Sequence, residues 1–282
     1  MHAAHHAQPP AVAGGEPEPA PRAVHPAGVM GPEAAAAPGT ARIAPGSSAR
    51  TLKAGGLVPF TATDFPGLLA AVVFVQGCPW RCDYCHNPHL QPRTATSPLD
   101  WVDILAFLRR RVGLIDGVVF SGGEPTMDPG LGTAIRQARD LGYKIGLHTG
   151  GTHPRRLAQV LPRVDWVGLD IKAGFDQYER ITRVAGSGVP ASASLQAVLD
   201  SGVDFECRTT AHPDLISAAE LLQLGRTLSG LGVSNYAVQI FRPQGCADDE
   251  LNARGQSLRE WPGEETRSAL AAMFSSFQIR RP

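Results

Sequence analysis

The stretch that decides the fold is LLAAVVFVQGCPWRCDYC, residues 68–85. Its first half is rich in β-branched and aromatic residues, which predicts a buried strand over residues 69–75. Its second half places three cysteines, Cys78, Cys82 and Cys85, directly after that strand. A dense group of cysteines indicates a metal site in a reducing compartment rather than a disulfide framework. We therefore expect a cytoplasmic metalloprotein.

Strand-like and helix-like segments alternate from residue 57 onward, and this order is typical of parallel α/β folds. Besides 69–75, strands are expected over residues 117–121, 144–149, 166–171, 204–210 and 236–241. The predicted fold class is α/β, with an open partial (β/α)6 barrel formed by residues 51–282. In parallel sheets, ligands bind beyond the carboxyl ends of the strands, so chemistry is expected there.

Helix signals lie between these strands. Ser97 is expected to cap a helix with Pro98 in its first turn, and an apolar face follows at Trp101, Leu105, Leu108 and Val112. Ser217 and Glu220 form a capping-box pattern before a later helix. Further helices are expected over residues 131–141, 154–161 and 195–201.

The composition excludes several classes of protein. Residues 1–50 are dominated by Ala, Pro, Gly and Glu and are expected to form a disordered tail, because they offer few large apolar side chains. The 26 basic and 26 acidic residues balance, so no nucleic-acid partner is expected. The longest apolar run, residues 68–75, falls far short of the roughly 20 residues that span a bilayer, so no membrane association is expected.

The cysteine spacing indicates an iron–sulfur cluster with one open corner. Thiolates are the preferred ligands of such clusters, and three of them leave one iron of a four-iron cubane without a protein ligand. The alternative is a zinc site made by the same cysteines with His86. That arrangement is disfavoured because the adjacent Cys85 and His86 would have to bind the same tetrahedral ion.

Polar residues at other strand ends complete the expected site. Gly122, Gly123 and Glu124 end the second expected strand, where glycines allow a ligand to approach the backbone and the carboxylate suits a cationic group. Alternation along residues 166–171 turns Asp170 and Lys172 into the barrel. Buried charges need partners. Asp170 and Lys172 therefore either meet a ligand or form a structural ion pair.

The fifth expected strand adds two candidates. Alternation there turns Arg208 inward with Glu206, while Cys207 faces the helices as a small buried residue. His212 lies just past this strand and is either a ligand contact or a capping or solvent-facing histidine. His148 ends the third strand and is a further candidate for the same mouth.

These motifs resemble those of the radical SAM superfamily, whose enzymes use a [4Fe-4S] cluster and S-adenosyl-L-methionine (SAM). Tyr84 matches the aromatic residue that precedes the last cysteine of that family's motif. The resemblance implies that Cys78, Cys82 and Cys85 hold the cluster. It also implies that SAM is bound by Tyr84, Gly122, Gly123, Glu124, Asp170, Lys172, Arg208 and His212.

Within that superfamily the chain resembles glycyl-radical activating enzymes, and among these the activating proteins of anaerobic ribonucleoside-triphosphate reductases. The Cys-His-Asn-Pro segment at residues 85–88 and the Asp-Ile-Lys segment at residues 170–172 carry this resemblance. It implies an oxidoreductase that cleaves SAM reductively, so that a 5′-deoxyadenosyl radical takes hydrogen from a glycine of the reductase. With no second cysteine cluster, an external one-electron reductant such as a flavodoxin is expected. The alternative is a radical SAM enzyme for another glycyl-radical protein or a small molecule.

One segment departs from the pattern. Related activating enzymes often read Asp-Thr-Asn-Gly after the third strand, where this chain has His148-Thr149-Gly150-Gly151. In the pyruvate formate-lyase activating enzymes that Asp helps to hold a monovalent cation with the Asp of the Asp-x-Lys segment. A cation at Asp170 is therefore not expected with the same ligands.

Overall fold

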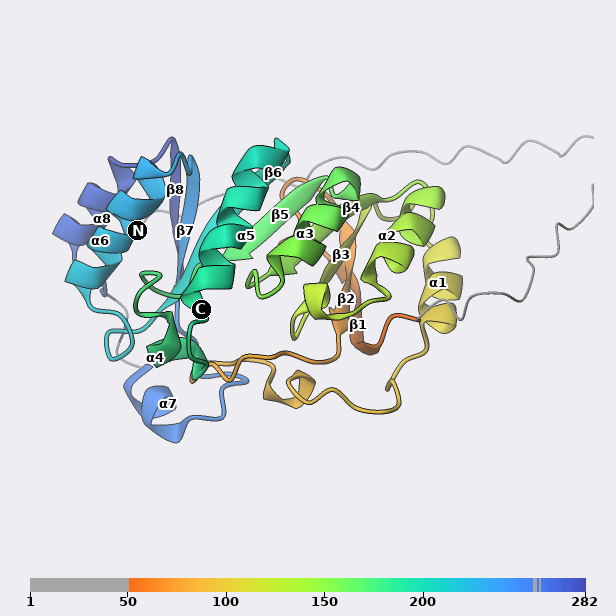
Figure 1. Cartoon of the computed structure of the whole chain (residues 1–282), viewed down its shortest axis with the longest axis horizontal. Coiled ribbons are helices and arrows are strands. Elements are labelled where there is room, and N and C mark those ends of the chain that lie inside the picture. The colour runs from red at the N-terminus through yellow and green to blue at the C-terminus, as the bar shows by residue number, and fades with distance from the viewer. Residues whose placement is uncertain (1–50, 256–257, 259) are drawn as a thin grey trace, which may run out of the picture. The chain divides into compact units, whose positions relative to one another are not determined.

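The computed structural model describes residues 51–255, 258 and 260–282. The predicted tail, residues 1–50, lies outside the described residues. The described part of the chain forms an α/β fold whose eight-stranded sheet runs in the order β1-β2-β3-β4-β5-β6-β7-β8 (Figure 1). Strand β1 is antiparallel to β2, and all later neighbours are parallel. The two end strands are not paired with each other, so the predicted open α/β barrel is confirmed.

The six predicted strands are present, with every boundary within one residue, and two more strands lie at the edges of the sheet. The strands are β1 (Ala54–Thr61), β2 (Ala70–Val75), β3 (Gly117–Gly122), β4 (Lys144–Thr149), β5 (Trp166–Asp170), β6 (Asp204–Ala211), β7 (Asn235–Ile240) and β8 (Ser276–Arg280). Strand β1 was not predicted because Gly55, Gly56 and Pro59 are typical of turns. An edge strand tolerates proline since its outer N–H groups need no partner in the sheet.

The helices are α1 (Trp101–Arg109), α2 (Leu131–Asp140), α3 (Pro154–Val160), α4 (Tyr178–Thr182), α5 (Gly188–Ser201), α6 (Ala218–Gly230), α7 (Asp249–Gly255) and α8 (Glu264–Ala271). Most of them cover one face of the sheet, whereas α4 and α7 lie below the strands in the view of Figure 1. The predicted Ser217–Glu220 capping box is present at the start of α6. Within the described residues, every helix is too short or too polar to cross a lipid bilayer.

The predicted Ser97 cap is wrong. Helix α1 begins at Trp101 with Asp100 in the cap position, and the Ser97 hydroxyl instead lies within hydrogen-bond distance of the backbone oxygens of Ala54 and Leu99. Val112, expected on the buried face of this helix, lies beyond its end and is 53% exposed. The bonds of Ser97 to β1 explain the difference, because that strand was not predicted.

Side-chain alternation divides the sheet into two faces. On β2, Ala71, Val73 and Val75 pack against the helices in the main core. Ala70 and Val72 turn to the opposite, inner face, in a smaller cluster with Phe65, Val119 and Trp166. Both faces of β2 are therefore buried, as expected for parallel strands.

Helix α5 is longer than predicted because its first half uses small residues. Gly188 lies so close to Phe175 that a Cβ atom there would overlap the Phe175 carbonyl oxygen. The buried Ser194 hydroxyl donates to the Gly151 carbonyl at 2.8 Å. Small side chains allow α5 to approach the loop after β4, but they leave no apolar periodicity for sequence analysis to find.

Candidate functional site

The loop that carries the three cysteines begins where β2 ends. Gly77 has a φ of +105°, which lets the chain turn out of the strand. The loop then closes on itself, since Gly77 N–H donates to Leu90 O at 2.7 Å and Cys78 N–H donates to Gln91 O at 3.0 Å. Cys78, Cys82 and Cys85 are partly buried free thiols. We call residues 77–91 the cysteine loop.

The segment after β5 supports this loop. The Trp80 ring meets the edge of Tyr178 with centroids 5.8 Å apart, and Arg81 N–H donates to Thr182 O at 2.9 Å. The Tyr178 hydroxyl in turn accepts from the backbone N–H of Lys172 at 3.0 Å. Helix α4 therefore ties the cysteine loop to the carboxyl end of β5, beside which Figure 1 shows it.

Lys172 lies beside the two aromatic rings of the cysteine loop. Its Nζ lies 5.4 Å from the ring centre of Tyr84, 5.8 Å from that of Trp80 and 3.7 Å from Asp170 Oδ2. Burial opposes the charged form, but the surrounding acidic groups, among them the ion-paired Asp170 carboxylate, outweigh it and raise the pKa of Lys172 well above its usual value. Lys172 thus carries a positive charge beside the cysteines.

Two of the cysteine thiols, Cys78 and Cys82, ionise less readily than a free thiol. Burial, with the nearby negative charge of Glu124, raises the pKa of the Cys78 thiol to about 12. Burial also raises the pKa of Cys82, while Lys172 acts in the opposite direction. Metal binding to such thiols must release protons, because the thiolate is the ligand.

The turn after β3 is fixed by a buried carboxylate. Glu124 is 1% exposed, and its Oε1 accepts from the backbone and hydroxyl of Thr126 at 3.0 and 2.6 Å. Oε1 also accepts from the Thr149 hydroxyl at 2.7 Å, and Oε2 accepts from Gly150 N–H at 3.0 Å. Glu124 therefore joins the ends of β3 and β4, a role that sequence analysis missed.

Gly123 lies against the cysteine loop. A Cβ atom at Gly123 would come within 2.4 Å of the Gly77 carbonyl oxygen, and one at Gly122 within 2.3 Å of Val75 N. Gly122 also has a φ of +116°. Both glycines are needed for the turn to pack directly on the start of the cysteine loop. The structure thus brings the turn and the loop together.

Arg208 lies deeper in the barrel than the cysteines. Its Nε donates to Glu206 Oε1 at 2.9 Å, and its guanidinium carbon lies 4.8 Å from the Trp166 ring centre. Arg280 on β8 also donates to both oxygens of Glu206, at 2.8 and 2.7 Å. Trp166 starts β5, so the Arg208 side chain extends toward the amino ends of the strands.

His148 belongs to the same inner cluster. Its Nε2 lies 2.9 Å from the Asp64 carbonyl oxygen, which requires a proton on Nε2, and the ring meets Trp166 edge-on. Burial and the neighbouring Arg208 lower the pKa of His148 to about 3. His148 is therefore neutral at physiological pH.

His212 is fully buried and has one unpaired ring nitrogen. Its Nδ1 accepts from the backbone N–H of Asp214 at 3.1 Å, which places the proton on Nε2. Nε2 has no hydrogen-bond partner, and the ring packs edge-on against Phe241. Burial lowers the pKa of His212. A buried unpaired N–H is costly unless a ligand accepts from it.

The donor set fits a cluster better than a single ion. His86, the fourth ligand of the zinc alternative, is occupied elsewhere: Nε2 lies 3.0 Å from Arg242 O and the ring stacks on Phe241. In a cubane each thiolate binds a different iron. Three thiols on one loop therefore suit a four-iron cluster with an open corner.

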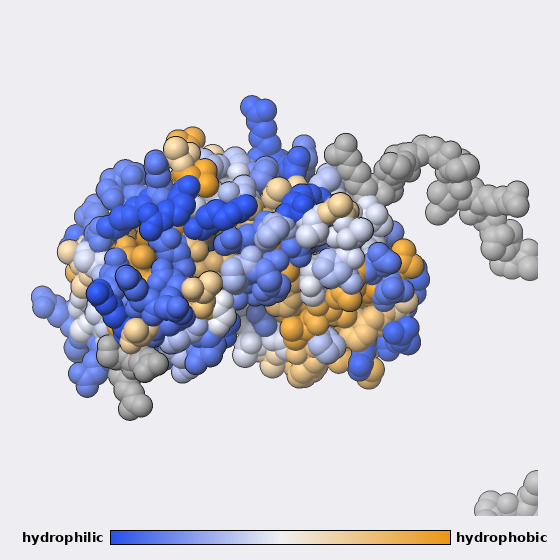
Figure 2. All heavy atoms as spheres, turned by 90° about the horizontal axis from the view of Figure 1, so that it is seen from below, coloured by the Kyte–Doolittle hydropathy of each residue, from blue (hydrophilic) through white to orange (hydrophobic). Residues whose placement is uncertain are grey.

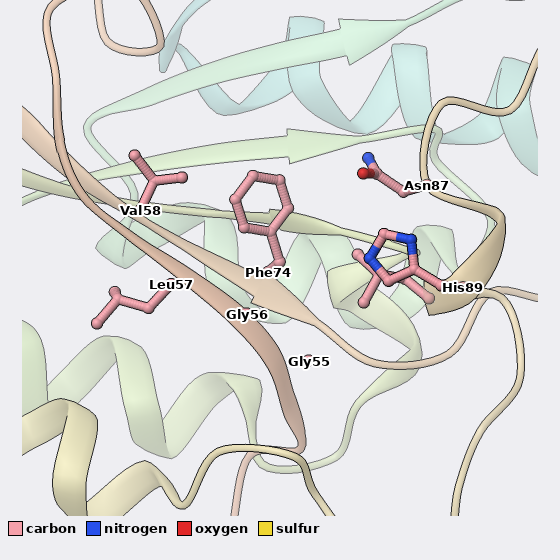
Figure 3. A pocket seen from close by; sticks show the side chains of 8 residues that line it. Gly55, Gly56, Leu57, Val58, Phe74, Asn87 and His89 are labelled. Atoms are coloured by element: carbon pink, nitrogen blue, oxygen red, sulfur yellow. The ribbon is translucent and has the colours of Figure 1, made fainter. Parts of the chain in front are cut away.

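A small pocket lies next to the cysteine loop, between β1, β2 and the residues that follow the cysteines. Its volume is about 220 Å³, and Figure 3 shows the Phe74 ring between Val58 and the polar side chains of Asn87 and His89. Val58 is 38% exposed and Phe60, also on β1, is 56% exposed. Figure 2 views the molecule from below the orientation of Figure 1 and shows a hydrophilic region on one side of this surface and an apolar region on the other.

Comparison with known proteins places this site in a family. Residues 72–215, about half of the chain, match the Radical SAM superfamily. The chain is 28% identical over 208 residues to a candidate glycyl-radical enzyme activating enzyme of Methanocaldococcus jannaschii. The aligned region covers 70% of this chain and 82% of that protein. It is 33% identical over 163 residues to the pyruvate formate-lyase-activating enzyme of Clostridium pasteurianum, with coverages of 56% and 67%.

A solved structure shares the fold. The crystal structure of Streptococcus suis SuiB bound to S-adenosylmethionine superposes with a TM-score of 0.53 at 12% identity. The match covers 73% of this chain and 48% of SuiB, so the chain spans about half the length of that protein. The chain belongs to the radical SAM superfamily. It is a radical SAM enzyme related to glycyl-radical enzyme activating enzymes, and its cofactors are a [4Fe-4S] cluster and SAM.

Proposed function

We propose that this chain installs a glycyl radical on an anaerobic ribonucleoside-triphosphate reductase. The observation that carries the proposal is the arrangement of the cysteine loop, whose three free thiols lie beside a buried lysine and a glycine turn at one edge of the sheet. When bound, the cluster supplies the electron that cleaves SAM to methionine and a 5′-deoxyadenosyl radical. The protein then has to bind, orient and shield the reacting groups.

The cluster ligands in this proposal are Cys78, Cys82 and Cys85. Lys172 receives the SAM carboxylate, because it is a buried cation next to the open side of the loop. Asp170, whose side chain is 42% exposed, keeps Lys172 charged and directed to the mouth.

The backbone of Gly122 and Gly123 receives the SAM amino group, while Tyr84 packs over Lys172. Glu124 holds this turn, since its carboxylate already accepts four hydrogen bonds. The unpaired Nε2–H of His212 donates to SAM, which would satisfy a buried donor. Arg208 lies deeper in the barrel than the cysteines and contributes to SAM binding through its positive charge.

His148 supports a target other than pyruvate formate-lyase. It stands where related activating enzymes often carry the Asp of a cation site, and its ring bonds the Asp64 backbone rather than Asp170. A monovalent cation beside Asp170 would therefore lack a second carboxylate from β4. The Cys-His-Asn-Pro and Asp-Ile-Lys segments add the sequence support for the reductase.

The pocket beside the cysteine loop supports a protein substrate. Its lining combines the apolar Phe74 and Val58 with the amide of Asn87 and the imidazole of His89, which suits one side chain of a peptide that enters next to the cysteines (Figure 3). The partner's glycine loop would thus lie along the inner side of β1 and β2. An external one-electron reductant, such as a flavodoxin, completes the proposal.

The test is anaerobic activation. Reconstituted protein is mixed with SAM, dithionite and the candidate reductase, and a glycyl-radical EPR doublet with one 5′-deoxyadenosine per radical is expected. The Cys82→Ser variant is the control and should give neither product. Formation of 5′-deoxyadenosine without a doublet would instead favour another glycyl-radical protein or a small-molecule substrate.

A further inference from the structure

Asp83 lies inside the cysteine motif and forms an ion pair with Arg183, which follows helix α4. The Nε and Nη2 atoms of Arg183 each lie 2.8 Å from a different Asp83 carboxylate oxygen. This two-point arrangement is the strongest geometry for an arginine–carboxylate pair. Asp83 follows Cys82 and precedes Tyr84, so the pair acts directly on the backbone that places Cys82 and Cys85.

The backbone of Arg183 is unusual. It has a φ of +59° at the end of α4, and among the described residues it is the sole non-glycine with a positive φ. Glycine is the residue that this position normally favours, because a Cβ atom is disfavoured in the left-handed region. The contact with Asp83 gives a physical reason for an arginine at such a site.

The same face of the loop has further contacts around Asp83. Arg81 N–H donates to Thr182 O at 2.9 Å, one residue before Arg183. On the other side, the Cys246 thiol lies 3.5 Å from the Asp83 carbonyl oxygen. The Asp83 side chain is only 16% exposed, whereas Arg183 is 62% exposed. Asp83 is thus fixed through both its side chain and its backbone.

We infer that Arg183 is a positioning residue for the iron–sulfur cluster. Its pair with Asp83 holds the cysteine loop in the shape that binds the cluster and neutralises a carboxylate that lies between two cluster ligands in the chain. The net charge around a cluster helps to set its reduction potential. An unpaired Asp83 should disfavour the reduced, more negative cluster. This inference rests on the cluster and not on the identity of the protein substrate.

The test separates positioning from folding. Arg183→Gly suits the left-handed backbone, so its thermal midpoint should equal or exceed that of the wild type. The same variant should lose iron to a chelator about 10-fold to 100-fold faster, the range typical when a residue that orients metal ligands is removed. Arg183→Gln should also lose iron faster. In both variants the reduction potential should fall, whereas Asp83→Asn, which leaves Arg183 unbalanced, should raise it.

Arg180→Gln is the matched control. Arg180 lies on α4, the helix that ends just before Arg183, and forms an ion pair with Glu220 at 2.9 Å rather than with the cysteine motif. It should change neither the potential nor the rate of iron loss. Wild-type potential and wild-type iron loss in both Arg183→Gly and Arg183→Gln would overturn the inference. These readouts need neither SAM nor a partner protein, so they remain decisive if the proposed function fails.

Discussion

Glu124 offers a sharp test of how the mouth of the barrel is held together. Its buried carboxylate accepts four hydrogen bonds from three residues, Thr126, Thr149 and Gly150. Glu124→Ala removes both acceptor oxygens and leaves the four donors without this partner. At about 1 kcal/mol for each lost bond, the free energy of unfolding should fall by about 4 kcal/mol. Glu124→Gln keeps one oxygen but places an amide N–H₂ toward Gly150 N–H, so it should cost about 1–3 kcal/mol.

The assay is urea unfolding of the cluster-free protein, with circular dichroism used to monitor the folded fraction. Glu265, an exposed residue of α8, supplies the control, and Glu265→Gln should change stability by less than about 0.5 kcal/mol. Reconstituted Glu124→Gln should also bind SAM more weakly, because the turn of Gly122 and Gly123 loses its anchor. A cost below about 1 kcal/mol for Glu124→Ala would refute the view that this carboxylate joins β3 to β4.

The remaining predictions concern SAM, pH and the substrate. Lys172→Met should raise the Kd for SAM about tenfold, equivalent to about 1.4 kcal/mol, whereas the control Lys144→Met, at the opposite end of the strands, should not. Isothermal titration measures both Kd values, and a wild-type Kd for Lys172→Met would contradict the role of Lys172. The pKa of His148 is depressed to about 3, so its stabilising effect is present above the unfolded pKa of 6.5 and is lost as the pH falls toward 3. Between pH 7.5 and pH 5 the wild type should lose about 2 kcal/mol more stability than His148→Gln, and parallel pH profiles from urea unfolding would argue against a buried neutral His148. Gly56→Val should fill the small pocket, since a Cβ atom there would lie at an ordinary contact distance of 3.7 Å from Phe74. This variant should slow glycyl-radical formation and leave SAM cleavage without the partner protein unchanged. An unaltered activation rate would show that the substrate does not use the pocket.

The features predicted from sequence are those that a short segment determines by itself. The strand over residues 69–75 and the cysteines that follow it are contiguous, so their spacing specifies both the strand and the loop. Alternation on β6 turned Arg208 inward and Cys207 toward the helices, and Cys207 is fully buried. The fold class followed because each strand repeats the same βα pattern.

The features that sequence analysis missed depend on contacts between distant segments. The contacts of Arg208 with Glu206 and Trp166 were not predicted, and Glu206 is also held by Arg280, which lies on a strand that was not predicted. The pairing of Arg183 with Asp83 joins residues 100 positions apart. No local pattern reports such a contact, although an arginine at a left-handed helix end is unusual once the structure is known.

The most direct test of the central claim is EPR spectroscopy of anaerobically reconstituted, dithionite-reduced protein with and without SAM. A four-iron cluster held by three cysteines predicts about four irons per chain and a reduced-cluster signal that changes when SAM occupies the open corner. Protein that carries zinc or no iron, or a reduced-cluster signal that SAM leaves unchanged, would contradict the account.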